Sequence, residues 1–108
     1  SYEQFSSDLK NLLNIFVSDE DLDDYIVMDE YSEKKSNYLF TATALLEDNT
    51  YIVFLSISNQ SNIYSNILRK KFNDKNKAKD YFNELVSLIK ENNVKDLSLI
   101  LINKLTKK

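Results

Sequence analysis

The pattern of apolar and polar residues from Asn37 to Ser58 predicts a β-hairpin. Asp48 and Asn49 suit a two-residue turn, because Asp and Asn tolerate the positive φ that such a turn requires. With this turn, Glu47 lies opposite Thr50, and the later pairs follow from the period of two along each strand. A slip of one residue would exchange the two faces, so the pattern selects one register. The first face carries Phe40–Ile57, Ala42–Leu55, Ala44–Val53 and Leu46–Tyr51, and the second carries Leu39–Ser58, Thr41–Ser56, Thr43–Phe54 and Leu45–Ile52.

The chain before this hairpin predicts a helix and a strand. Residues 1–17 place apolar side chains at spacings of three and four, which is typical of an amphipathic helix. An acidic loop follows at 18–24. Residues 25–31 then alternate as a strand, and residues 33–36 form a polar turn into the hairpin.

The chain after the hairpin predicts two further strands and a helix. Residues 63–72 fit either a helix or a fourth strand, and a four-residue connection favours the strand. Residues 75–92 carry a clear apolar stripe behind a capping residue, Asn73 or Asp74. The short apolar run at 97–102 predicts a last strand that joins the sheet.

These elements predict an α+β fold in a single domain of residues 1–108. The sheet is an antiparallel β-meander of three to five strands, with an N-terminal and a C-terminal helix packed on one face. The order of elements is α-β-β-β-(β)-α-β. Ala42 and Ala44 leave room on the first face of the hairpin, so the 75–92 helix is expected to cross there.

The composition excludes several kinds of chemistry. The sequence contains no Cys, His, Gly or Pro. Disulfides, thiolate metal sites and the commonest general base are therefore absent, and glycine-rich phosphate loops cannot form. No pair of carboxylates is singled out by its spacing, so neither catalysis nor a cofactor is expected. No apolar run is long enough to span a bilayer.

The first residues are amphipathic and lack the basic region of a signal peptide, which predicts a cytoplasmic protein. A signal removed before Ser1 would leave no trace in this sequence.

Charge is distributed unevenly along the chain. Residues 1–54 carry a formal charge of −9 and residues 55–108 carry +6, for a net charge of −3. This asymmetry has two interpretations, which are ordinary solvated surface and an acidic face that meets a basic partner. The acidic residues of that second interpretation are Asp19, Glu20, Asp21, Asp23, Asp24, Asp29, Glu30 and Glu33.

Part of the acidic segment has the spacing of a calcium-binding loop. Positions one, three, five and twelve of an EF-hand-like pattern are Asp19, Asp21, Asp23 and Glu30. Asp24 stands where such loops carry Gly, and 25–31 reads as a strand instead of an exiting helix. Calcium binding is therefore an alternative to an acidic recognition surface or a solvated loop.

A basic run in the second half of the chain offers an alternative function. Lysines and one arginine between 69 and 79 could follow a phosphate backbone. Against this, the chain is acidic overall, and Phe72 and Tyr81 are expected to face the core instead of stacking on bases. The residues of this alternative nucleic-acid contact are Arg69, Lys70, Lys71, Lys75, Lys77 and Lys79.

These observations favour a small protein-binding module without catalytic activity. We expect a regulator or inhibitor from a bacterium with an AT-rich genome, or from a phage or mobile element. Its partner would be another protein, one that is basic or itself binds nucleic acid. The high Tyr content is compatible with an interface, although β-propensity and codon usage are the favoured explanation.

Overall fold

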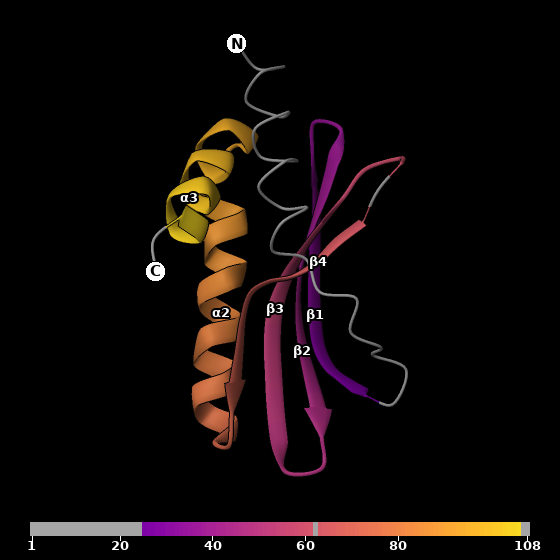
Figure 1. The fold of residues 1–108 in the computed structure, drawn as a ribbon, viewed down its shortest axis with the longest axis vertical. Coiled ribbons are helices and arrows are strands. Elements are labelled where there is room, and N and C mark those ends of the chain that lie inside the picture. The colour runs from indigo at the N-terminus through magenta and orange to yellow at the C-terminus, as the bar shows by residue number, and fades with distance from the viewer. Residues whose placement is uncertain (1–24, 62, 107–108) are drawn as a thin grey trace.

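The computed structural model describes residues 25–61 and 63–106, which form a four-stranded sheet followed by two helices (Figure 1). The strands are consecutive neighbours in one antiparallel sheet, which confirms the predicted meander. The predicted helix over 1–17 lies outside the described residues. The elements are β1 (Ile26–Lys35), β2 (Tyr38–Glu47), β3 (Thr50–Ser58), β4 (Ile63–Phe72), α2 (Lys75–Glu91) and α3 (Val94–Thr106).

The central hairpin of β2 and β3 has the register that the sequence predicts. Glu47 pairs with Thr50 across the turn, and the pairing continues without a shift to Leu39 and Ser58. Asp48 closes the turn at a φ of 52°, a conformation that Asp tolerates better than most residues.

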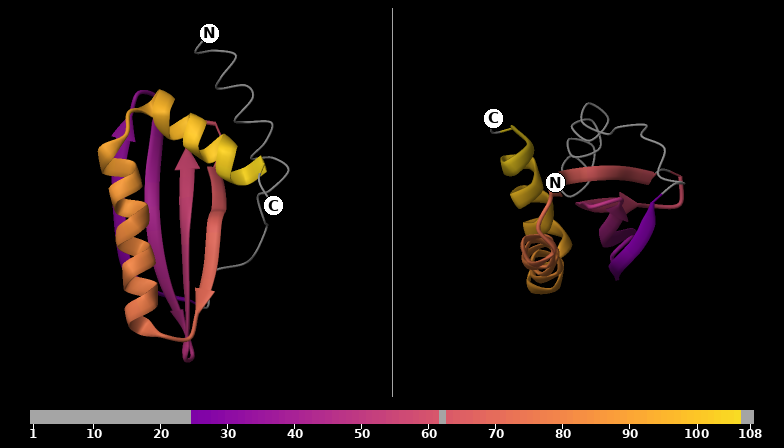
Figure 2. Two further views of the ribbon diagram at one scale, coloured as in Figure 1. Left: turned by 90° about the vertical axis from the view of Figure 1, so that its left-hand side faces the viewer. Right: turned by 90° about the horizontal axis from the view of Figure 1, so that it is seen from below.

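The first face of this hairpin carries the main core, and α2 packs against it. Ala42 and Ala44 are fully buried, and the aromatic and leucine side chains of α2 fill the space above them. Both helices lie on this side of the sheet, with α2 along the strands and α3 across them (Figure 2). The buried residues of α2 are Ala78, Tyr81, Phe82, Leu85 and Ile89.

Asp74 caps the N-terminus of α2. Its carboxylate accepts hydrogen bonds from the backbone N–H groups of Asn76 at 2.8 Å and Lys77 at 3.2 Å, so two N–H groups of the first turn are satisfied. At the other end, the Asn92 side chain donates to the Leu88 carbonyl at 2.8 Å. A helix needs such partners because its terminal backbone groups have none within the helix.

The second face of the sheet is apolar at one end and polar at the other. Leu45, Ile52 and Phe54 are buried there beside Tyr25. Further along, hydroxyl side chains pair across neighbouring strands: the Oγ atoms of Ser56 and Ser65 lie 3.4 Å apart, and Ser32 Oγ lies 2.9 Å from Thr41 Oγ1.

The predicted strand at 97–102 is wrong, because this segment belongs to α3. Leu97 and Leu101, four residues apart, are fully buried in the main core, as helical periodicity requires. The Asn93 side chain accepts from the Asp96 N–H at 2.8 Å and so caps the first turn. The apolar residues at 97–102 alone fit both a strand and a helix. The helical spacing becomes visible only when residues 94–105 are considered together.

The predicted turn at 33–36 lies too early, because β1 continues to Lys35 and the chain turns at Ser36 and Asn37. Ser36 takes the positive φ, at 59°. Glu33 and Lys35 point to the same side of the strand and form an ion pair at 2.8 Å. Three polar residues of the expected turn, Glu33, Lys34 and Lys35, thus lie in extended backbone.

Strand β4 is confirmed as a strand but is irregular. Its register against β3 shifts twice, between the pairs of Val53 and Leu55 and again between those of Leu55 and Ile57. Asn66 and Leu68 have positive φ values of 60° and 53° within these two β-bulges. In a chain without Gly, these bulges force residues that carry a Cβ into the left-handed region.

Candidate interaction surfaces

The three residues of the predicted acidic surface that the structure describes, Asp29, Glu30 and Glu33, lie on β1, at one edge of the sheet. Asp29 and Glu30 are exposed, and Asp29 Oδ1 accepts a hydrogen bond from the Glu30 N–H at 2.9 Å. The register of β1 shifts between Val27 and Asp29, so the strand bulges just before these carboxylates. The remaining five acidic residues of the predicted surface, at 19–24, lie outside the described residues.

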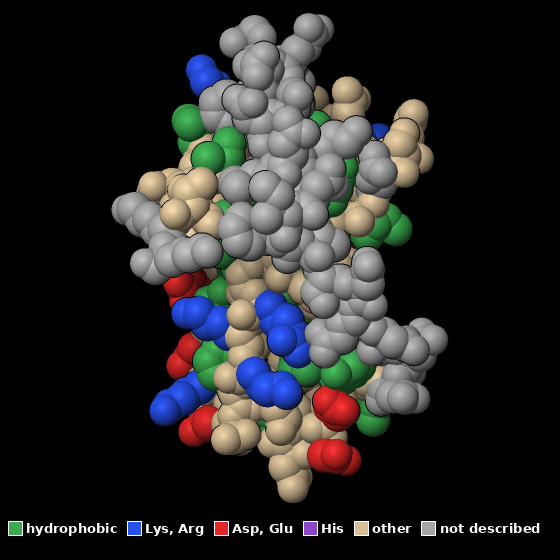
Figure 3. Space-filling view, in the orientation of Figure 1, with side chains coloured by type: hydrophobic (Ala, Val, Ile, Leu, Met, Phe, Trp, Pro, Cys, Tyr) green, Lys and Arg blue, Asp and Glu red, His purple; other side chains and the backbone are tan. Residues whose placement is uncertain are grey.

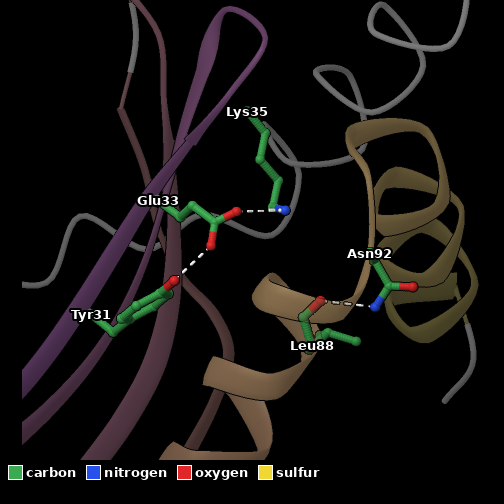
Figure 4. A network of polar contacts seen from close by, with 5 residues as sticks. All are labelled: Tyr31, Glu33, Lys35, Leu88 and Asn92. Atoms are coloured by element: carbon green, nitrogen blue, oxygen red, sulfur yellow. Dashed lines mark hydrogen bonds and ion pairs between the residues drawn. The ribbon is translucent and has the colours of Figure 1, made fainter.

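Glu33 belongs to a polar network on the helix side of β1 (Figure 4). Its carboxylate accepts from the Tyr31 hydroxyl at 2.6 Å and pairs with Lys35 Nζ at 2.8 Å. The hydrogen bond from Lys35, followed by that from Tyr31, holds the pKa of Glu33 below its ordinary value. The same contact raises the pKa of Tyr31. Lys90 of α2 lies 5.0 Å from the Tyr31 ring centre, so the network joins β1 to the helix.

A second group of residues, all exposed except the half-buried Glu47, gathers where β1 begins and the β2–β3 turn closes. Ile26 pairs with Leu46, so the start of β1 lies beside that turn. Ile26 and Val27 are 66% and 56% exposed, which is unusual for two adjacent branched apolar residues. Ile26 and Val27 pair with Leu46 and Leu45 and so point to opposite faces. The nearest acidic residues that the structure describes are Asp29 along β1 and Glu47 and Asp48 at the turn. We call this group the turn-end surface, and its members are Ile26, Val27, Asp29, Glu47 and Asp48.

The basic residues of the alternative function lie together on the surface. Arg69, Lys70 and Lys71 end β4, and three further lysines stand in the first turns of α2. All six are exposed. Figure 3 shows basic side chains gathered over the end of β4 and the start of α2, with acidic side chains beside them.

The aromatic residues within this basic run face inward. The Phe72 and Tyr81 rings pack against each other with centroids 5.6 Å apart, and both contact the main core. Lys70 Nζ lies 4.6 Å from the Tyr81 ring centre, so this lysine covers an aromatic ring of its own chain. Neither ring is available to stack on an unpaired base.

The calcium-loop residues are described in part. Glu30 lies within β1 and pairs with Thr43, so the strand that the sequence predicted stands in place of an exiting helix. Asp19, Asp21 and Asp23 lie outside the described residues. Among residues 25–61 and 63–106, no cluster of three or more His, Cys, Asp or Glu side chains could hold a metal ion.

Sequence reasoning missed a pocket of about 590 Å³ at the opposite end of the sheet from the turn-end surface. The β1–β2 and β3–β4 connections form it, and most of its lining residues are polar. The signal in the sequence was the concentration of Ser and Asn in both connections. The lining residues are Lys34, Asn37, Tyr38, Leu39, Ser58, Asn59, Gln60 and Ser61.

No protein-family model matches the chain, and neither the curated proteins nor the solved structures show a significant match to it. None of the described helices combines the length and the apolar character that spanning a membrane requires. The function must therefore be argued from the surfaces themselves.

Proposed function

We propose that the protein is a small non-catalytic module that binds a basic protein partner through the turn-end surface, as a regulator or inhibitor of that partner. The observation that carries this proposal is the pairing of Ile26 with Leu46, which puts two exposed apolar side chains at the end of the sheet where the half-buried Glu47 and the exposed Asp48 close the turn. An apolar centre with a charged rim is the usual anatomy of a protein interface.

The chemistry of this surface selects the partner. Ile26 and Val27 would supply the apolar area that leaves water on binding. Asp29, Glu47 and Asp48 would then face Lys or Arg side chains around that contact and steer the encounter at low salt. Nucleic acid would be repelled from this end of the sheet.

Affinity capture with purified protein as bait tests the proposal. We expect the wild type to recover a basic protein in stoichiometric amount. The double variant Ile26→Ser/Val27→Ser should lose it, and Asp48→Asn should weaken its capture at low salt. Asn keeps the tolerance for positive φ at position 48, so the second variant removes charge without disturbing the turn.

Ile63→Ser is the matched control, because Ile63 is the most exposed large apolar residue that the structure describes, at 73%, and lies at the other end of the sheet. Capture that survives in the double variant, or fails equally in the control, would contradict the proposal.

Nucleic-acid binding is the second candidate, and it is favoured by the six exposed Lys and Arg side chains that gather at the β4–α2 junction. It predicts that fluorescence anisotropy detects oligonucleotide binding that weakens steeply with salt, because neutralised phosphates release counterions. Lys71→Glu should reduce the salt slope. If micromolar protein shows no oligonucleotide binding at low salt, nucleic-acid binding is ruled out as the function.

A further inference from the structure

Strand β1 presents a regular outer edge. It pairs with β2 on one side, and no described strand pairs with its other side (Figures 1 and 2). From Asp29 to Lys35 its register against β2 is unbroken. The other edge strand, β4, carries two bulges, which blunt it as a template for a further strand.

The sequence of this edge is self-complementary when two copies run antiparallel. If a two-fold axis passes between the Ser32 residues of both copies, Glu30 lies opposite Lys34 of the second copy. Asp29 lies opposite Lys35 in the same register. Each pair occurs twice, and opposite charges placed directly across two strands attract.

Going beyond the proposed function, we propose that the protein forms a symmetric homodimer in which the two β1 strands pair about Ser32 into one continuous eight-stranded sheet. The register joins like faces. Glu30 and Lys34 pair with Thr43 and Leu39 of the hairpin's second face, so their charge pairs form on that side. A two-fold interface is closed and therefore stops at two copies.

The charged groups retain capacity for these contacts. Asp29 uses Oδ1 for the Glu30 N–H, and a carboxylate has a second oxygen that can accept from Lys35 of the other copy. Lys35 gives one contact to Glu33 and has further N–H donors. Glu30 and Lys34 are both exposed and can reach across the new strand pair.

Sedimentation equilibrium with charge-reversed variants tests the dimer. We expect the wild type to dimerise between about 1 µM and about 500 µM, the range of a small and transient interface. Glu30→Lys and Lys34→Glu should each weaken self-association by about tenfold or more, because each change turns two attractions into repulsions. An equimolar mixture of the two variants should associate again, since each supplies the charge that the other lacks.

The double variant Glu30→Lys/Lys34→Glu should also recover the dimer, because the swap restores complementarity. Glu91→Lys is the matched control, since it reverses an exposed carboxylate on α2, outside the register, and should change nothing. A wild type that stays monomeric over the whole range overturns the proposal. So does a mixture that fails to associate, or growth into larger species. Asp29 belongs to both surfaces, but all five turn-end residues are unchanged in these variants, so a failure of the dimer and a failure of partner capture can be told apart.

Discussion

The hydroxyl of Tyr81 on α2 forms a hydrogen bond to the irregular strand β4, and removing it would show how much this contact stabilises the protein. This hydroxyl donates to the Leu68 carbonyl oxygen at 2.5 Å, within a bulge of β4. The hydroxyl of Tyr64 is also buried but has no hydrogen-bond partner among the residues that the structure describes. The substitutions Tyr81→Phe and Tyr64→Phe therefore remove the same group from a satisfied and an unsatisfied environment.

The expected cost of Tyr81→Phe follows from what is lost and what remains. The ring keeps its packing against Phe72 and its contact with Lys70. The lost hydrogen bond contributes roughly 0.5 to 1.5 kcal/mol, and a buried carbonyl left without a donor costs roughly 1 to 3 kcal/mol. Because the contact is only partly buried, we expect a loss of about 1 to 2.5 kcal/mol in the free energy of unfolding.

Tyr64→Phe should have no cost, or should stabilise the protein by up to about 1 kcal/mol. Its hydroxyl gives up water on folding and gains no bond in return among the described residues, so removing it removes a desolvation penalty. Burial, the larger cause, also raises the pKa of this hydroxyl, which is consistent with that environment.

Urea denaturation followed by circular dichroism measures both values, and equal slopes against urea would show that the unfolded states are comparable. If Tyr64→Phe costs as much as Tyr81→Phe, then hydrogen bonding does not distinguish the two sites. A silent Tyr81→Phe would show that the bulge is held by packing alone.

The same residue predicts a dependence on alkaline pH. Burial, with a smaller contribution from Glu84, raises the pKa of Tyr81 to about 12. The unfolded chain ionises Tyr near pH 10, so the stability due to neutral Tyr81 is present below about pH 10 and is lost as pH rises toward 12. Comparing the wild type with Tyr81→Phe by urea melts across this window should show a smaller loss for the variant.

Three further predictions concern the core and the helices, each measured as a change in the free energy of unfolding. Ala44→Leu should cost roughly 1 to 3 kcal/mol, because it overpacks the crossing with α2. Thr41→Val should cost under about 1 kcal/mol, because it loses only an exposed contact with Ser32. If Thr41→Val costs more than Ala44→Leu, the assigned faces are wrong. Asp74→Ala should cost about 0.5 to 2 kcal/mol through loss of the α2 cap, and an unchanged midpoint would refute that role. Leu101→Ala should cost roughly 2 to 5 kcal/mol, because this α3 residue is fully buried; a surface-like value would contradict its place in the core.

The pattern of apolar residues was sufficient to predict an element where it fitted only one of the two periods, two for a strand or about 3.6 for a helix. The register around Asp48 followed from alternation with period two, because a slip would have moved Phe40 and Ile57 to the other face. Likewise, α2 followed from its stripe and its cap, and Ala44 correctly indicated where that helix crosses. These are contacts between residues that are close in sequence, or between faces that the pattern itself defines.

The tertiary structure decided the features that depend on competition among distant residues. The apolar residues at 97–102 fit both the strand period and the helical period. The segment is a helix because Leu97 and Leu101 then reach the core built by the sheet and α2. The bulges of β4 have no local signal, since no Gly marks them, and the Tyr81 hydroxyl that meets one of them comes from α2.

The sequence placed charges along β1, but strand parity and position along the strand decided their roles. Alternate residues point to opposite faces, so Glu33 turns toward the helix and joins Tyr31 and Lys35. Asp29 and Glu30 remain exposed at the edge of the sheet, just beyond the bulge. Strand parity thus separates Glu33 from Glu30, whereas Asp29 lies on the same face as Glu33 and is exposed at its place beside the bulge.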